Sequence, residues 1–149
     1  MLKQEFKFIK ENLKNIEIEN IQISKGSVGW HFDHSLKVIN SIFKALNKSN
    51  PKDYKKEINL VRFFVFLIGF FPRGKVKSPK RVLPPEIITK EEIERQLNLA
   101  IKSFSLIDDL EENQYFEHPI FKQLNKKKAL KFLKLHTNHH LKIVKDVLK

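Results

Sequence analysis

The 149-residue chain contains no cysteine. This absence excludes disulfide bonds, thiolate nucleophiles and thiolate metal sites, so histidine and carboxylate side chains are the plausible ligands that remain for a metal. The length suffices for one domain with a full hydrophobic core, and we expect a single helical-bundle domain over residues 1–149.

The sequence also lacks an apolar run long enough to cross a bilayer. The longest one, Ile58 to Phe71, contains Arg62 and falls short of the roughly 20 residues that a spanning helix needs. Residues 1–15 interleave Lys and Glu with apolar side chains, unlike a secretion signal. We therefore expect a cytoplasmic protein with no membrane partner, and a buried helix over Ile58 to Phe71; contact of this run with a membrane is the less favoured alternative.

Acidic residues are too few to balance the basic ones, and the formal net charge is +12. Lysine supplies most of the excess, whereas arginine is the usual bidentate reader of guanine and phosphate. A solvated cationic surface is therefore favoured over a nucleic-acid partner. The excess lies in a proline-containing connection and in the last predicted helix: Arg73, Lys75, Lys77, Lys80 and Arg81; Lys126, Lys127, Lys128, Lys131, Lys134, Lys142 and Lys145.

Helical periodicity dominates the chain and strand-like alternation is absent, so we predict an all-α protein. Ser27 is suited to cap one helix, and Thr89 with Glu92 has the spacing of a capping box at the start of another. The pattern predicts long helices at about residues 2–16, 27–47, 90–111 and 126–148. Two short links and one long crossover between the second and third helices favour an up-down-down-up four-helix bundle, with an additional helix in the crossover.

Three histidines in the last predicted helix constrain the function most. His136 and His140 are four residues apart, so they lie one helical turn from each other and can present two imidazoles to one metal ion. On a helical wheel both face the apolar stripe, while His139 lies at its edge. Because buried polar groups without partners cost about 1 to 3 kcal/mol each, a shared metal would satisfy both inward rings.

A third ligand must come from elsewhere in the chain. His31 and His34 are the other paired histidines, in a strongly apolar stretch of the second predicted helix. The helical wheel places His31 within the apolar arc and His34 at its border, and periodicity alone does not choose between them.

Four segments together resemble the DinB/YfiT-like family of metal-dependent four-helix bundles, and most of all a subfamily of uncharacterised domains of unknown function. The resemblance covers nearly the whole chain from Gly26 onward. It is carried by residues 30–36 (WHFDHSL), the connection from Arg73-Gly74-Lys75 to Pro84-Pro85, residues 115–121 (YFEHPIF) and residues 136–141 (HTNHHL).

This resemblance implies an up-down-down-up bundle whose metal ligands are His34, His136 and His140, with nickel or zinc as the ion. It also implies a small-molecule substrate and a reaction such as thiol transfer, with a low-molecular-weight thiol as cosubstrate, or hydrolysis. Three histidines leave coordination positions open, as in catalytic rather than structural sites. One departure is visible, because relatives often have glycine after the Phe of the His-Pro loop, where this chain has Lys122.

Other candidate groups receive less specific roles. We interpret His31 and His139 as neighbours of the ligands, with His139 a candidate proton shuttle. We expect Asp33 to be solvated or to be an acid of the first turn of the second helix, and His118 to shape its loop with Pro119.

Three hypotheses follow from the sequence. The favoured one is a divalent-metal-dependent enzyme acting on a small molecule at a three-histidine site. The second is a basic module that binds nucleic acid or another anionic surface. The third is a non-catalytic helical homodimer that packs through the aromatic residues of the crossover, Phe63, Phe64, Phe66, Phe70 and Phe71.

Overall fold

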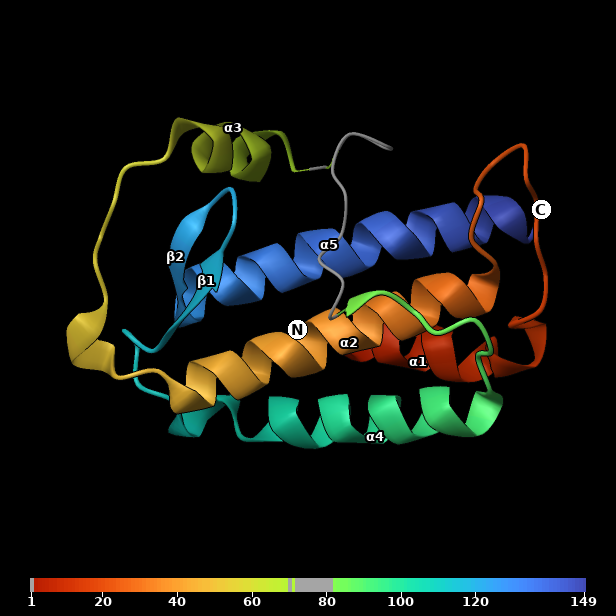
Figure 1. Cartoon of the computed structure of the whole chain (residues 1–149), viewed down its shortest axis with the longest axis horizontal. Coiled ribbons are helices and arrows are strands. Elements are labelled where there is room, and N and C mark those ends of the chain that lie inside the picture. The colour runs from red at the N-terminus through yellow and green to blue at the C-terminus, as the bar shows by residue number, and fades with distance from the viewer. Residues whose placement is uncertain (1, 70, 72–81) are drawn as a thin grey trace.

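The structure is a computed structural model, and it describes residues 2–69, 71 and 82–149. It is mostly helical, with one small two-stranded sheet (Figure 1). Among the described residues the helices are α1 (Lys3–Glu11), α2 (Val28–Lys48), α3 (Leu60–Ile68), α4 (Lys90–Ser105) and α5 (Lys126–Val147), and the strands are β1 (Tyr115–His118) and β2 (Lys122–Asn125).

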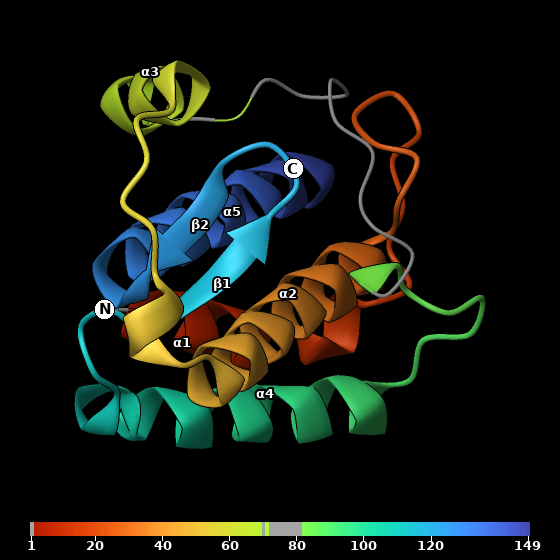
Figure 2. The ribbon, with the colours of Figure 1, turned by 60° about the vertical axis from the view of Figure 1, so that its left-hand side comes forward.

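Helix α2 lies at the centre of the fold, packed between α4 on one side and α5 on the other (Figures 1 and 2). Its apolar residues Phe32, Leu36, Ile39 and Leu46 are completely buried, because they face both neighbours. Helix α1 packs against α4 and α5. The N-terminal third of α2, which contains His34, lies against α5 near His136 and His140.

Side-chain caps set where the long helices begin. Ser27 Oγ accepts a hydrogen bond from the backbone N–H of Trp30 at 3.1 Å, and Thr89 Oγ1 accepts one from Glu92 at 3.2 Å, as their positions in the sequence predict. Asn125 Oδ1 caps α5 in the same way at 3.3 Å. These bonds satisfy N–H groups that have no partner within the helix.

The predicted helix ends need small corrections. Helix α1 ends at Glu11, and a short 3₁₀ segment follows at Leu13–Asn15. Helix α4 ends at Ser105, and another 3₁₀ segment follows at Ile107–Asp109. The basic connection from Arg73 to Arg81, and Phe70, lie outside the described residues.

The antiparallel hairpin β1–β2 is an element that the sequence reading missed. Tyr115 pairs with Asn125 and His118 pairs with Lys122, which leaves a tight loop at residues 119–121. Lys122 adopts a φ of 60°, in the left-handed region that glycine tolerates best. This is the position at which the resemblance predicts glycine, so the departure in sequence coincides with a backbone conformation that favours glycine.

The prediction of a buried helix over Ile58 to Phe71 is wrong. A helix does form there, but α3 lies outside the bundle in both views of the ribbon, and its outward face is exposed (Figures 1 and 2). Leu67, for example, is 69% exposed, while Arg62 is 7% exposed. None of the described helices combines the length and apolar character required to traverse a bilayer.

Candidate metal centre

Three imidazoles from two helices meet in the interior. His34 of α2 and His136 and His140 of α5 each offer a ring nitrogen, and these nitrogens all lie within 4.8 Å of one another. The ring centroids are separated by 5.2 Å for His34 and His136, 4.8 Å for His34 and His140, and 4.7 Å for His136 and His140. The structure thus brings together the three residues expected to ligate a metal, although ligation itself stays a prediction.

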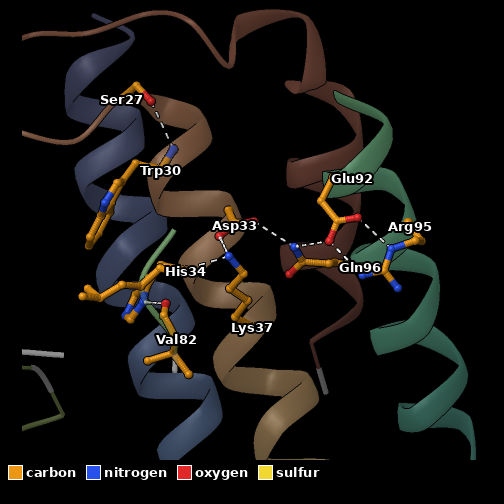
Figure 3. A network of polar contacts seen from close by, with 10 residues as sticks. Ser27, Trp30, Asp33, His34, Lys37, Val82, Glu92, Arg95 and Gln96 are labelled. Atoms are coloured by element: carbon orange, nitrogen blue, oxygen red, sulfur yellow. Dashed lines mark hydrogen bonds and ion pairs between the residues drawn. The ribbon is translucent and has the colours of Figure 1, made fainter. Parts of the chain in front are cut away.

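The orientation of His34 is set by the chain that follows the basic connection. Its Nδ1 donates a hydrogen bond to the carbonyl oxygen of Val82 at 2.8 Å (Figure 3). A carbonyl only accepts, so in the neutral ring the lone pair is on Nε2. A hydrogen bond of this kind on the far nitrogen is the usual support of a metal-binding histidine.

His140 is supported by a second histidine. Nδ1 of His31 lies 2.9 Å from Nδ1 of His140, and Nε2 of His31 lies 2.9 Å from Oγ of Ser24. When His140 donates from Nδ1, its Nε2 carries the lone pair, and His31 in turn holds its proton at Nε2 and donates to Ser24. This tautomer leaves Nε2 of His140 free to bind a metal. His31 therefore supports a ligand without being one of the trio.

His136 has a buried ring nitrogen, Nδ1, for which a metal ion would be a suitable partner. Its Nδ1 is buried and, within the described part of the chain, accepts and donates no hydrogen bond. The ring stacks on Phe132 with centroids 5.5 Å apart, and the edge of Phe71 lies nearby at 6.3 Å. The residue as a whole is half-buried. Aromatic rings therefore line the centre on the side of His136.

Burial favours the neutral form of the three rings. Desolvation lowers the pKa of His34, and it holds the pKa values of His136 and His140 well below the ordinary histidine value, because removing an imidazolium from water is unfavourable. The proximity of the rings lowers the pKa values of His136 and His140 further. Neutral imidazole is the form that binds a metal ion.

Trp30 covers the centre on the α2 side. Its ring stacks on His34 with centroids 5.1 Å apart and planes inclined by 24°, and it lies 6.1 Å from His140. Trp30 lies in the first turn of α2 and its backbone N–H donates to the Ser27 cap, so the cap also helps to position this aromatic ring (Figure 3).

The prediction that Asp33 is solvated is wrong. The carboxylate is fully buried, with Oδ2 paired to Lys37 Nζ at 2.7 Å and Oδ1 accepting from Gln96 Nε2 at 2.8 Å. Gln96 also donates to Glu92, which binds Arg95 through both carboxylate oxygens (Figure 3). This network ties α2 to α4 at the residue next to His34.

The charges of that network shift the pKa values of His34 and of Glu92. At His34, Asp33 raises the pKa and Lys37 lowers it, so the ion pair partly cancels its own effect on the ring. Hydrogen bonding from Arg95 lowers the pKa of Glu92 to about 2. Because Arg95 is exposed to solvent, we assign that outer pair little stabilising energy.

The two histidines not yet described, His118 and His139, also lie outside the trio. His118 Nδ1 accepts hydrogen bonds from the backbone N–H groups of Ile120 and Phe121, so it shapes its loop as predicted. His139 is half-buried beside His140, with ring centroids 5.2 Å apart, and it contacts Phe71. Its expected role as a proton shuttle stays a prediction.

Sequence reasoning missed the groups that hold the ligands in place. The Val82 carbonyl carries no side-chain signal, and Ser24 lies in a loop that no motif marks. Gln96 is polar at a position facing the core of α4, which is a signal that could have pointed to a buried partner such as Asp33.

Comparison of the chain with protein-family models, with curated proteins and with solved structures finds no match. The functional argument therefore rests on the residues themselves.

Proposed function

We propose that this protein is a divalent-metal-dependent enzyme of the DinB/YfiT-like type, acting on a small molecule at His34, His136 and His140. The observation that carries the proposal is the approach of three ring nitrogens, from two distant segments, to within 4.8 Å of one another. Nickel or zinc is the proposed ion because the family resemblance implies it, whereas imidazole ligands alone would also accept iron, copper or cobalt.

The residues present suit a metal of this class. Burial lowers the pKa of all three rings and so favours their neutral form, Nδ1 of His34 is engaged by a carbonyl, and the buried Nδ1 of His136 has no partner among the described residues. A bound cation would act as a Lewis acid toward a coordinated water, thiol or substrate oxygen. The chain's own part is to orient the rings through Val82 and His31, and to line the site with aromatic groups.

The reaction proposed is thiol transfer or hydrolysis. Because the chain contains no cysteine, a thiol must arrive with a cosubstrate of low molecular weight. His31 and His139 are the titratable side chains adjacent to His140 that could take part in moving protons.

The fold proposed is an up-down-down-up bundle of α1, α2, α4 and α5. The colour sequence along the ribbon supports it, because α2 and α4 run in the same direction and α5 runs in the opposite one (Figure 1). The long segment between α2 and α4, which contains α3, is the crossover that such a topology requires. We also propose a cytoplasmic location, where a chain without cysteine needs no oxidising compartment.

Metal analysis of untagged protein tests the proposal. The wild-type chain, purified without histidine tag or nickel resin, is expected to carry close to one ion per chain by elemental analysis, and the His34→Ala/His136→Ala double variant is expected to carry none. His139→Ala is the matched control, because it removes an adjacent histidine outside the trio. Full metal content in the double variant would refute the ligand assignment, and turnover of low-molecular-weight thiols by the loaded wild type would support the transferase.

A nucleic-acid-binding module is less well supported. Several lysines of α5 already contact groups of their own chain: Lys126 binds the carbonyl of Leu110, Lys128 the Tyr54 hydroxyl, and Lys145 lies over the Phe8 ring. A titration of binding against salt decides this alternative, because neutralised phosphates give a steep slope.

A further inference from the structure

Helix α3 turns its apolar face away from the protein. Its six outward residues are 55% to 69% exposed, and every one of them is hydrophobic: Leu60, Val61, Phe63, Phe64, Leu67 and Ile68. The charged residue of the helix, Arg62, faces inward and is buried. This is the reverse of an ordinary surface helix, whose polar face meets water.

Specific contacts hold the helix in this orientation. The Arg62 guanidinium donates to the carbonyl oxygens of Phe121 and Gln123 in the hairpin, and to that of Glu57. Asn59 caps α3 by accepting from the N–H of Arg62 at 2.8 Å, and its amide donates to the carbonyl of Ile120. Phe66 packs edge-on against Phe121. The hairpin therefore fixes which face of α3 is presented outward.

Two further apolar residues near α3 are exposed. Ile58, just before the helix, is 95% exposed, and Ile120 at the hairpin tip is 39% exposed. An exposed apolar helix face of this kind marks a surface that binds a partner.

Basic side chains lie close to α3, on the side of the helix that contacts the hairpin. Lys131 lies over the Phe66 ring at 5.4 Å, Lys122 follows Phe121 in the hairpin, and the backbone of Lys55 binds Gln123. All three lysines are exposed, and so is the carboxylate of Glu57, two residues after Lys55. With a net charge of +12 on each chain, a second copy would bring like charges against like charges.

We propose that the outward face of α3 inserts into the surface of an anionic lipid bilayer. The apolar side chains fit the boundary between headgroups and acyl chains, and the nearby exposed lysines can reach the anionic headgroups. Nucleic acid is negatively charged but has no apolar layer to cover α3. A second copy of the chain would present an apolar surface but carries the same positive charge. The nine residues of α3 are too few to span a bilayer, so the helix lies in the plane of the interface.

This proposal replaces the sequence-based expectation of no membrane partner, which depended on burial of Ile58 to Phe71. It does not depend on the metal centre, because no residue of α3 belongs to the histidine trio.

Vesicle co-sedimentation of the full chain tests the proposal. Vesicles of phosphatidylglycerol and phosphatidylcholine are expected to bind the protein, and vesicles of phosphatidylcholine alone are expected to bind it weakly. The Phe64→Ser/Leu67→Ser variant is expected to lose about tenfold or more in partitioning, since two apolar side chains no longer enter the lipid. The matched control is Ile21→Ser/Ile87→Ser, which removes two comparably exposed residues from loops outside α3.

Charge and self-association give the remaining readouts. Lys122→Gln/Lys131→Gln is expected to weaken binding to the anionic vesicles, with little change on neutral ones. Equal binding by the α3 variant and wild type would overturn the proposal, as would an absence of binding to anionic vesicles. Sedimentation in the absence of lipid that reveals a dimer lost in the α3 variant would also overturn it, in favour of a second copy.

Discussion

Nδ1 of His31 and Nδ1 of His140 lie 2.9 Å apart, across the contact between α2 and α5. One of the two nitrogens must donate and the other accept, so the pair couples the tautomers of both rings. His140 presents a lone pair at Nε2 only when it is the donor. His31 is therefore a positioning residue for the proposed centre, although it is not one of the three grouped histidines.

Replacing His31 tests this coupling. His31→Leu is expected to weaken metal binding by about 10-fold to 100-fold, because the orienting acceptor for His140 is lost. Isothermal titration of metal-free protein with Ni²⁺ or Zn²⁺ measures the change. His31→Gln is the conservative control, since its amide oxygen can accept from His140 and is expected to restore much of the affinity. Equal affinities for the Leu variant and wild type would show that His31 does not orient the ligand.

The stability of the metal-free protein is expected to depend on pH through the buried imidazoles. The folded-state pKa values of His34, His136 and His140 are lowered, so between these values and the unfolded value of about 6.5 the unfolded chain binds more protons. The free energy of unfolding therefore falls as pH drops below about 6.5. Urea unfolding at a series of pH values measures it, and a His136→Phe variant is expected to show a shallower loss.

The same experiment has a clear contrary outcome. If the free energy of unfolding were constant or rose on acidification through that window in the metal-free protein, the rings would not be held neutral by burial.

Asp33→Ala is expected to lower the free energy of unfolding by about 1 to 3 kcal/mol, because it removes the buried acceptor of Gln96 and the partner of Lys37. Lys37 is partly exposed, so its ammonium group can turn to water, which keeps the loss below that of a fully buried pair. Chemical unfolding measures the change. Asp108→Ala, at an exposed position, is the control and is expected to stay within about 0.5 kcal/mol of wild type.

Lys122→Gly is expected to stabilise the protein by up to about 1 kcal/mol. The left-handed backbone at φ 60° costs a residue with a side chain about 1 to 2 kcal/mol, of which the greater freedom of glycine in the unfolded chain returns part. Thermal unfolding provides the measurement. Lys131 is an exposed residue away from the ends of α5, and Lys131→Gly is expected to lower the stability instead. A loss of stability in both variants would contradict the backbone argument.

Local signals in the sequence were sufficient for much of the helical structure. The caps at Ser27 and Thr89 are encoded within four residues, and the His136 to His140 spacing needs only the helical repeat. The choice of His34 over His31 was not local. It followed from the family resemblance, and the structure groups His34 with the other two rings while His31 contacts His140.

The features that the sequence reading missed depend on distant partners. Asp33 is buried because Gln96, from another helix, supplies a hydrogen bond that no helical wheel of α2 includes. Helix α3 is exposed because Arg62 binds carbonyls of the hairpin, and the two strands of that hairpin are too short for alternation to reveal them. In each case a polar contact between distant segments outweighed the local hydrophobic pattern.

The three grouped histidines all project from the interiors of α2 and α5, whose packing involves a large apolar core. Such a site is preorganised: the scaffold, rather than the ion, bears the entropic cost of gathering the ligands. This separates the protein from small zinc modules, in which chelation of the metal unfolds the chain. Here a chelator is expected to strip the ion and leave the far-ultraviolet circular dichroism spectrum unchanged, so that metal exchange can proceed without refolding.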